Sequence, residues 1–309
     1  MNPGAQSDDG ETMSGKRLAL ITPIRNEREQ LDRLRRTVLS QELRPDLWVI
    51  VVGESSDGSL TAAEQLFSDL NWVSVIPQKT YAPGHGHMNF ARGVNDGLSF
   101  ILEKEGGHPF QYLSKVDATV DLDTDYFLKL AQALDMDEEL VIVCGEESFE
   151  VDGQKQGVPT QPSGDIIIGF NDNRLYRRDF LVSVGGYPVS ISPDTVLLVK
   201  SYKMGKRQKV LTTTGYCETR LGFNKEGAWK GYFHWGRGMY RLDYHPLLVV
   251  TVGLYFGLRF PPHYQGLALP MGFMTAFVNR ERRIDDPEIR QYFRKERLVQ
   301  VARSWFGGK

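Results

Sequence analysis

The feature that most constrains the fold is a repeated alternation of short apolar runs with amphipathic segments in the first half of this 309-residue chain. The apolar runs have the length and composition of buried strands, and the segments between them carry apolar residues at helical spacing. The expected strands are 17–24, 47–54, 72–78 and 112–116, and the expected helices are 26–41, 60–70, 87–106 and 123–136. Strands and helices that alternate in this way form a parallel, doubly wound sheet with right-handed connections. We therefore predict an α/β, Rossmann-like domain.

The second half of the chain departs from this rhythm. A strand is expected over 139–149, a loop over 151–163, a strand, short helix and tight turn over 174–188, and a helix over 193–205. From Tyr244 onward the pattern is helical. The polar residues 1–15 contain no apolar run and predict a disordered tail. We therefore expect a mostly parallel sheet domain over 16–220 and a C-terminal helical, aromatic-rich extension over 221–309.

Composition argues against several classes of protein. The 37 Lys and Arg residues nearly balance the 39 Asp and Glu residues, so a nucleic-acid-binding surface is not expected. Cys144 and Cys217 have no paired spacing and do not indicate a disulfide or a zinc site. The first strand–helix turn has neither G-x-G-x-x-G nor a P-loop, which argues against a nicotinamide enzyme or an ATPase. The longest apolar run, 246–258, is shorter than the ~20 residues of a membrane-spanning helix.

Polar residues stand where the predicted strands end, and ligands bind at that edge of a doubly wound sheet. Glu54 or Asp57, after the second strand, can accept hydrogen bonds from a base or a ribose. Turn capping explains Thr22 and Glu54 equally well. Asp194 begins a helix, where a carboxylate also stabilises the helix dipole.

Several segments in register resemble the family 2 glycosyltransferases, which are inverting enzymes with the GT-A fold. The segments are LITPIRNEREQLDRLRRTVLSQ (20–41), WVIVVGESSDGS (48–59), ARGVNDGL (91–98), KVDATVDLDTDYF (115–127), RLYRRDFLVSVGGYP (174–188) and SPDTVLLVKSYKMGKR (192–207). The resemblance implies a GT-A catalytic domain that moves a sugar from a UDP- or GDP-linked nucleotide-sugar donor. The acceptor would be a glycan or a polyprenyl-linked molecule in polysaccharide or glycoconjugate synthesis.

The resemblance also implies roles for single residues. Glu54 matches a family Asp that contacts the base, and Asp117 matches the first Asp of the family's Asp-x-Asp motif. Asp194 matches the general base, which takes the proton of the acceptor hydroxyl. The residues expected to bind the donor are Thr22, Pro23, Arg25, Glu27, Glu54, Asp57, Arg92, Asp117 and Arg237.

The metal site departs from the family pattern. The family holds Mg²⁺ or Mn²⁺ chiefly through the last Asp of Asp-x-Asp, and Thr119 stands there in this chain. A hydroxyl is a poorer ligand for these hard cations than a carboxylate. Asp117 and the diphosphate can hold the ion, with Thr119 on a bound water, or Asp121 can replace Thr119. Alternatively, cations such as Arg237 or Lys230 neutralise the diphosphate without a metal. We expect a retained but weakened metal site.

The aromatic and basic segment 229–283 favours a surface that lies in a membrane interface, with a helical cap on the sheet or a dimer interface as alternatives. Within it, His234 is a further candidate metal ligand. The basic, amphipathic residues 285–306 form an expected terminal helix. We expect a cytoplasmic protein that lies peripherally on the inner face of the cell membrane. Two rival functions are a catalytically impaired relative that only binds nucleotide or glycan, which Thr119 favours, and a nucleotidyltransferase, whose glycine-rich first turn is missing.

Overall fold

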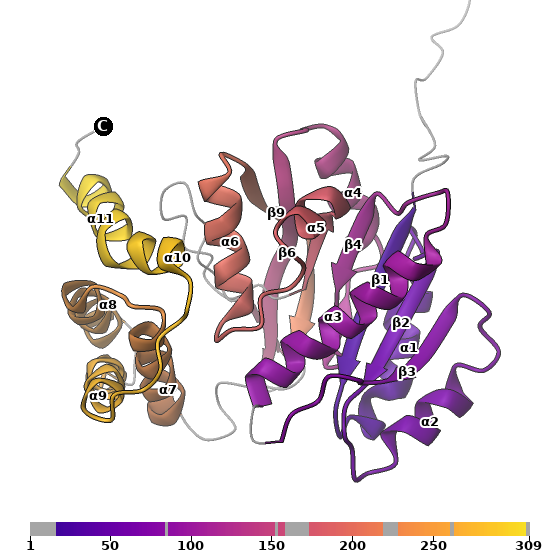
Figure 1. Ribbon diagram of the computed structural model, residues 1–309, viewed down its shortest axis with the longest axis horizontal. Coiled ribbons are helices and arrows are strands. Elements are labelled where there is room, and N and C mark those ends of the chain that lie inside the picture. Colours follow the sequence, from indigo (N-terminus) through magenta and orange to yellow (C-terminus); the bar gives the residue numbers. More distant parts are fainter. Residues whose placement is uncertain are drawn as a thin grey trace, which may run out of the picture.

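The computed structural model describes residues 17–83, 86–151, 154–157, 173–218, 228–259 and 263–306. The expected disordered tail, 1–15, and much of the expected loop 151–163 lie outside the described residues. Figure 1 shows a twisted sheet with helices on both faces and, beside it, a group of helices from the C-terminal part of the chain.

The elements of the first half alternate as the sequence predicts. They are β1 (Leu18–Ile24), the 3-10 turn η1 (Arg28–Gln30), α1 (Leu31–Leu39), β2 (Leu47–Val52), α2 (Ser59–Leu66), β3 (Val73–Pro77), α3 (Gly86–Lys104), β4 (Tyr112–Lys115), β5 (Val120–Leu122) and α4 (Tyr126–Asp135). The sheet domain continues with β6 (Leu140–Val151), β7 (Gln154–Gly157), β8 (Arg174–Arg177), α5 (Arg178–Ser183), α6 (Pro193–Lys203) and β9 (Arg207–Glu218).

The sheet has the strand order β3-β2-β1-β4-β8-β6-β9-β5, and β7 pairs with β6. The predicted parallel arrangement of β1, β2, β3 and β4 is confirmed, with Ile21 opposite both Val49 and Lys115. β8 runs antiparallel to β4 and β6, whereas β6 and β9 are parallel. The sheet is therefore mixed but mostly parallel. The carboxyl ends of β1, β2 and β4 share one edge, where a ligand is expected.

Strand alternation divides the core into two layers. On β1, Leu18 and Leu20 pack with α1, α2 and α4, whereas Ala19 and Ile21 pack on the opposite face with α3, α5 and α6. Helix α3 lies close to the sheet because Gly97 has no side chain: a Cβ there would come within 2.7 Å of Ile21 Cγ2. Burial on both faces is the reason why these strands are continuous apolar runs in the sequence.

The structure differs from the sequence prediction in several places. The mainly polar β9 and the short β5 are not among the expected strands, and they pair with each other. Residues 154–157, expected in a loop, form β7. The fourth helix begins at Tyr126 with Asp125 as its N-cap residue, but the Asp125 side chain makes no capping hydrogen bond. Asp123 accepts a hydrogen bond from the Gly215 N–H at 2.8 Å, and Asp125 accepts one from the Thr214 hydroxyl at 2.7 Å, so both carboxylates hold β9 instead.

The C-terminal helices lie within the expected extension 221–309 and begin before Tyr244, where the helical sequence pattern starts. They are α7 (Ala228–Arg241), α8 (Pro246–Arg259), α9 (Gln265–Val278), α10 (Pro287–Gln291) and α11 (Arg297–Phe306), with a π-helical turn, η2 (Tyr292–Glu296), between the last two. Ile289, Tyr292 and Phe293 join the sheet's second core layer, whereas α7, α8 and α9 form a small core of their own. Within the described residues, no helix is both long enough and apolar enough to cross a membrane.

Candidate functional site

The turn after β1 is fastened to the turn after β2. Asn26 has a φ of 52°. Its N–H donates to Ser55 Oγ at 3.1 Å, and its Oδ1 accepts from the Ser56 N–H at 2.8 Å. The N–H of Glu27 donates to the Ser59 hydroxyl at 3.0 Å. These bonds place Glu27, half-buried, beside the carboxyl end of β2.

Asp57 organises the same turn. Its carboxylate accepts hydrogen bonds from the N–H of Arg28 at 3.0 Å, and from the N–H and hydroxyl of Ser59 at 3.0 and 2.5 Å. The bond from the Ser59 hydroxyl is the main cause that holds the pKa of Asp57 below its usual value. The Asp57 carboxylate is therefore already hydrogen-bonded within the turn. Its contact with a nucleotide-sugar donor stays a prediction.

The rim above these turns carries exposed side chains suited to a base. Arg25 and Glu54 are exposed. The Arg25 Nε donates to the Glu54 carbonyl oxygen at 3.1 Å, and its guanidinium carbon lies 5.4 Å from the centre of the Tyr81 ring. Planar cationic and aromatic groups next to a carboxylate can stack on a base and accept its hydrogen bonds. Thr22, in contrast, is fully buried. Its hydroxyl accepts a hydrogen bond from the Trp48 indole N–H at 3.0 Å, so the side chain forms a contact between neighbouring strands of the sheet.

The start of α3 brings Arg92 to the same edge. The Arg92 guanidinium donates to Asn89 Oδ1 at 3.1 Å. The Asn89 amide also bonds both the N–H and the carbonyl of Ala82, at 2.9 and 2.7 Å, and so fixes the connection from β3. Pro23 is half-buried where β1 meets α3, and a Cβ built on Gly93 would lie 3.5 Å from it.

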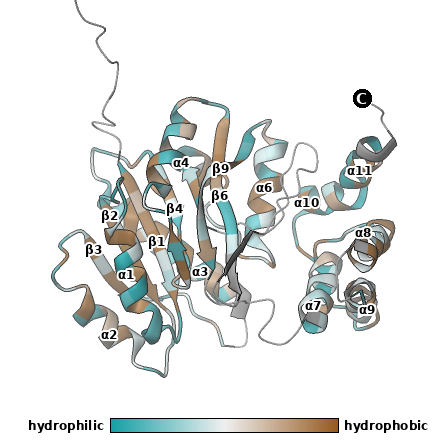
Figure 2. Ribbon diagram, turned by 180° about the vertical axis from the view of Figure 1, so that it is seen from behind, coloured by the Kyte–Doolittle hydropathy of each residue, from teal (hydrophilic) through white to brown (hydrophobic). Residues whose placement is uncertain are grey.

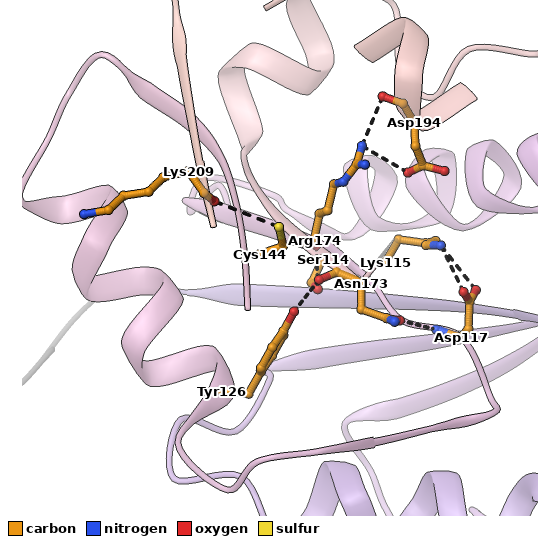
Figure 3. Close-up of polar contacts among 9 residues, drawn as sticks. All are labelled: Ser114, Lys115, Asp117, Tyr126, Cys144, Asn173, Arg174, Asp194 and Lys209. Atoms are coloured by element: carbon orange, nitrogen blue, oxygen red, sulfur yellow. Dashed lines mark hydrogen bonds and ion pairs between the residues drawn. The ribbon is translucent and has the colours of Figure 1, made fainter. Parts of the chain in front are cut away.

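Asp117, after β4, lies against a buried ammonium group (Figure 3). Lys115 Nζ is 3.2 and 3.3 Å from the two carboxylate oxygens of Asp117. The Lys115 side chain is 3% exposed and that of Asp117 25%. The ammonium also lies 4.8 Å from the centre of the Phe90 ring. The site therefore holds a carboxylate that is partly open to solvent and whose charge is balanced from within the protein.

Asp194 lies in the first turn of α6, beside the guanidinium of Arg174. One Arg174 Nη donates to the Asp194 carbonyl oxygen at 3.0 Å and lies 3.5 Å from its Oδ1. The Arg174 side chain is 3% exposed and that of Asp194 15%. Among the described residues, Oδ1 of Asp194 is buried without a hydrogen-bond partner. The ion pair with Arg174 offsets part of the cost of burying this oxygen, and a further donor, such as a ligand hydroxyl, can supply the missing hydrogen bond.

Two consecutive residues form hydrogen bonds with the backbones of Asp117 and Asp194. Asn173 Oδ1 accepts the N–H of Asp117 at 2.9 Å, and its neighbour Arg174 holds Asp194. Figure 3 shows Asp117 and Asp194 at the two ends of this line of contacts. The Tyr126 hydroxyl donates to the Asn173 carbonyl and so helps to fix the position of Asn173. The pairing of β4 with β8 places Lys115, which contacts Asp117, opposite Arg174, which contacts Asp194.

Arg237 and His234 come from α7 in the C-terminal group. The Arg237 Nε donates to Glu281 Oε1 at 2.8 Å, and Arg241 binds the other oxygen of the same carboxylate. His234 is exposed. In the part of the chain that the structure describes, no three His, Cys, Asp or Glu side chains are grouped to hold a metal ion. A role of Arg237 or His234 in the donor site stays a prediction.

Asp117 and Thr119 by themselves do not fit a resident divalent cation. Both oxygens of Asp117 face the Lys115 ammonium, which would repel a dication at the same position. Thr119 is half-buried and offers only a hydroxyl. Asp121, the alternative ligand, is exposed and lies 3.8 Å from Arg33. A cation here needs oxygen ligands from elsewhere, such as a diphosphate.

Lys115, Asn173 and Arg174 are parts of the site that sequence reasoning missed. A usable signal exists for the two cations, because Lys and Arg are rarely buried unless they are paired. Each interrupts or begins a short apolar strand, in YLSKV and RLYR. The partner of each cation lies on another element, so the sequence alone does not identify it.

Comparisons with known proteins agree with this fold. No protein-family model matches the chain, and no curated protein matches it in sequence. Among solved structures, the mannosyltransferase PcManGT from Pyrobaculum calidifontis, in complex with GDP-Man and Mn²⁺, superposes with a TM-score of 0.54 at 15% identity, covering 96% of this chain and 89% of that one. Residues 1–349 of S. aureus TarS in complex with UDP give a TM-score of 0.52 at 16% identity, covering 94% and 92% of the two chains.

A longer S. aureus TarS structure gives a TM-score of 0.52 at 16% identity, with 92% of this chain covered. This chain spans 54% of the length of that structure. At identities of 15–16%, the similarity to these structures shows that the folds are alike and nothing more. The chain has a GT-A, Rossmann-like α/β fold, with a mostly parallel sheet and a C-terminal helical extension.

Proposed function

We propose that this protein is a glycosyltransferase that uses a nucleotide-sugar donor. The observation that carries the proposal is the pair Asp117 and Asp194, held by consecutive residues beside the carboxyl edge of the parallel strands. The GT-A fold supports it, since structures of similar fold contain UDP or GDP-Man. Sugar transfer needs one group near the diphosphate and a second, basic group at the acceptor hydroxyl.

We infer an inverting mechanism. The acceptor oxygen attacks the anomeric carbon from the face opposite to the diphosphate. The new carbon–oxygen bond forms while the bond to the diphosphate oxygen breaks, and the diphosphate leaves with the bonding electrons. Asp194 takes the proton of the acceptor hydroxyl, and Arg174 holds that carboxylate in place. Lys115 offsets the charge of Asp117, which would otherwise repel the anionic leaving group.

The nucleotide would bind over the first two strand ends. Arg25, Tyr81 and Glu54 form the base rim, and Arg92 is placed for a phosphate. UDP- and GDP-linked donors are both expected candidates. Mg²⁺ or Mn²⁺ would bind at Asp117 only together with the donor, whose diphosphate supplies the missing oxygen ligands; the ion adds positive charge near the leaving group.

The acceptor is proposed to be a glycan or a polyprenyl-linked molecule, in the synthesis of a polysaccharide or glycoconjugate. The proposed location is cytoplasmic and peripheral on the inner face of the membrane. The resemblance of the motif segments to the family 2 enzymes supports the proposed acceptor, and the aromatic, basic segment 229–283 supports the proposed location.

A thermal-shift screen tests the proposal. UDP, GDP and their sugars, each with and without Mn²⁺, are added to the wild type and to Asp117→Ala. We expect one nucleoside diphosphate to stabilise the wild type, and the corresponding sugar donor to be hydrolysed slowly. The absence of stabilisation by every nucleotide would contradict the proposal.

One rival has a specific observation in its favour. The ion pair of Lys115 with Asp117, together with Thr119, also suits a catalytically impaired relative that only binds nucleotide or glycan. In that case nucleotide stabilises the protein, no donor turns over under any metal, and Asp194→Asn changes nothing. Turnover that depends on Asp194 separates the enzyme from this rival.

A further inference from the structure

The C-terminal helices expose an unusually continuous apolar face. On α8, Leu247, Leu254 and Leu258 recur at helical spacing, and on α9 so do Leu267, Met271 and Val278; these side chains are 51–81% exposed. Figure 2 shows α8 and α9 mostly in the colour of hydrophobic residues, on the part of the molecule farthest from the sheet's parallel half. Contiguous exposed apolar surface of this kind indicates an interaction site. We call these side chains the α8–α9 face.

Glycine residues lie where the helices of this group cross, beside a core of larger apolar side chains. Helices α7 and α9 cross where Gly236 meets the Leu269 carbonyl and Gly272 meets the Phe233 carbonyl, leaving no room for a Cβ. A second close approach joins Gly253 of α8 to Gly266, next to the start of α9. Other large apolar side chains of α8 and α9 lie outside these crossings and are exposed, as on the α8–α9 face. Helices that face lipid pack in this way.

The charge of this region differs from that of the rest of the chain. Residues 228–306 contain twelve Lys and Arg and six Asp and Glu, a net charge of +6. Since the whole chain carries −2, the remainder carries −8. A basic surface next to an exposed apolar face complements the anionic headgroups of a phospholipid bilayer.

Part of this charge is concentrated at one end of the α8–α9 face. The Asp243 carboxylate, 7% exposed, lies 3.1 Å from Arg283, 3.1 Å from Arg290 and 3.7 Å from Arg294. The three guanidinium groups carry two more positive charges than this one carboxylate offsets. Asp243 lies shortly before the start of α8 and Arg283 shortly after the end of α9, so this cluster, which Arg290 of α10 and Arg294 of η2 complete, lies near the end of the face where α8 begins and α9 ends.

The opposite end carries an aromatic pair. Trp229, at the start of α7, and Tyr264, just before α9, lie with their ring centres 5.9 Å apart, and they are 37% and 49% exposed. Trp and Tyr with one wet and one apolar side are enriched at membrane–water boundaries.

We propose that the α8–α9 face docks this protein on a bilayer that contains anionic phospholipids. The leucine and methionine side chains enter the acyl region, and the arginines around Asp243 meet the phosphates. A second copy of the chain is the less suitable occupant, because two identical faces with a positive charge surplus repel each other. The proposal does not depend on sugar transfer, which takes place at the sheet.

Vesicle co-sedimentation tests this docking. The full chain is mixed with phosphatidylcholine vesicles, or with vesicles that contain about one third phosphatidylglycerol. The apolar variant is Leu258→Glu with Leu267→Glu. Its matched control is Met136→Glu, which changes an 86% exposed apolar residue in the sheet domain. The charge variant is Arg290→Gln with Arg294→Gln, and its control is Arg207→Gln on β9, where the side chain is 65% exposed.

We expect the wild type and both controls to sediment with the anionic vesicles and at least about tenfold more weakly with phosphatidylcholine alone. Both test variants should lose at least about tenfold in partitioning. Their circular dichroism should match the wild type, which shows that the fold is intact. The proposal is overturned if the wild type does not sediment, or if the apolar variant binds as well as the wild type. The proposal is also overturned if the wild type forms a dimer and does not bind vesicles, and if the apolar variant is a monomer. That result would assign the α8–α9 face to a contact between two copies of the chain.

Discussion

The ion pair between Lys115 and Asp117 should contribute measurably to stability. At 3.2 Å, a Coulomb energy at an effective dielectric of about 20 gives a ceiling of about 5 kcal/mol. Fully exposed pairs contribute at most about 1 kcal/mol, and breaking a buried pair costs about 3–5 kcal/mol. Lys115 is almost completely buried, but a quarter of the Asp117 side chain is exposed. We therefore expect a coupling of about 2 kcal/mol between the two residues.

Urea denaturation of four proteins measures this coupling: the wild type, Lys115→Met, Asp117→Asn and the double variant. The control is Asp121→Asn, the same change at an exposed carboxylate 3.8 Å from Arg33, and it should alter the free energy of unfolding by less than about 0.5 kcal/mol. A coupling near zero, or a loss in Asp121→Asn as large as that in Asp117→Asn, would refute the reasoning.

Three further predictions follow from single contacts. Lys115→Met removes the positive charge beside Asp117, so titration calorimetry should show tighter binding of Mn²⁺ together with nucleoside diphosphate; unchanged affinity would show that the ammonium does not oppose the cation. Burial alone would raise the pKa of Glu281, but hydrogen bonds from Arg237 and Arg241 outweigh it and hold the pKa below 4.5. The stabilisation by Glu281 is thus complete above about pH 4.5 and lost as pH falls through the lower folded-state pKa, and the stability difference between wild type and Glu281→Gln should shrink over that range. Gly97→Ala places a Cβ 2.7 Å from Ile21 and should lower the free energy of unfolding by about 1–3 kcal/mol in denaturant titrations, whereas Gly107→Ala, with open space around it, should not.

Strands β1, β2 and β4 of the parallel half could be predicted because they are buried on both faces. The runs that contain Ala19 and Val49 are almost entirely apolar, so composition identifies them, whereas the short run YLSKV, which contains Leu113, also includes Ser114 and Lys115. β9 could not be predicted in the same way. Its sequence, RQKVLTTTGYCE, has few apolar residues, and it is a strand because its backbone pairs with β6 and β5. For α7, three glycines disfavour a helix locally, and packing on α9 outweighs that preference.

Some residues of the candidate site could likewise be predicted from the sequence, and others could not. Asp117 was accessible to sequence reasoning because it directly follows a recognisable strand. Asp194 could be proposed only through the family resemblance, since a carboxylate in a first helical turn has an ordinary explanation. Its cation, Arg174, lies twenty positions away on β8, and only the fold brings the two together. Asp123 and Asp125 look like a helix cap in the sequence, but in the structure both carboxylates accept hydrogen bonds from β9.

The most direct test of the proposed function is the release of nucleoside diphosphate from a panel of UDP- and GDP-linked sugars by the wild type and by Asp194→Asn. We predict that the wild type hydrolyses at least one donor, and that Asp194→Asn is slower by at least about a hundredfold while it still binds the product diphosphate. Equal rates in the two proteins, or no release from any donor, would contradict a transferase in which Asp194 takes the proton.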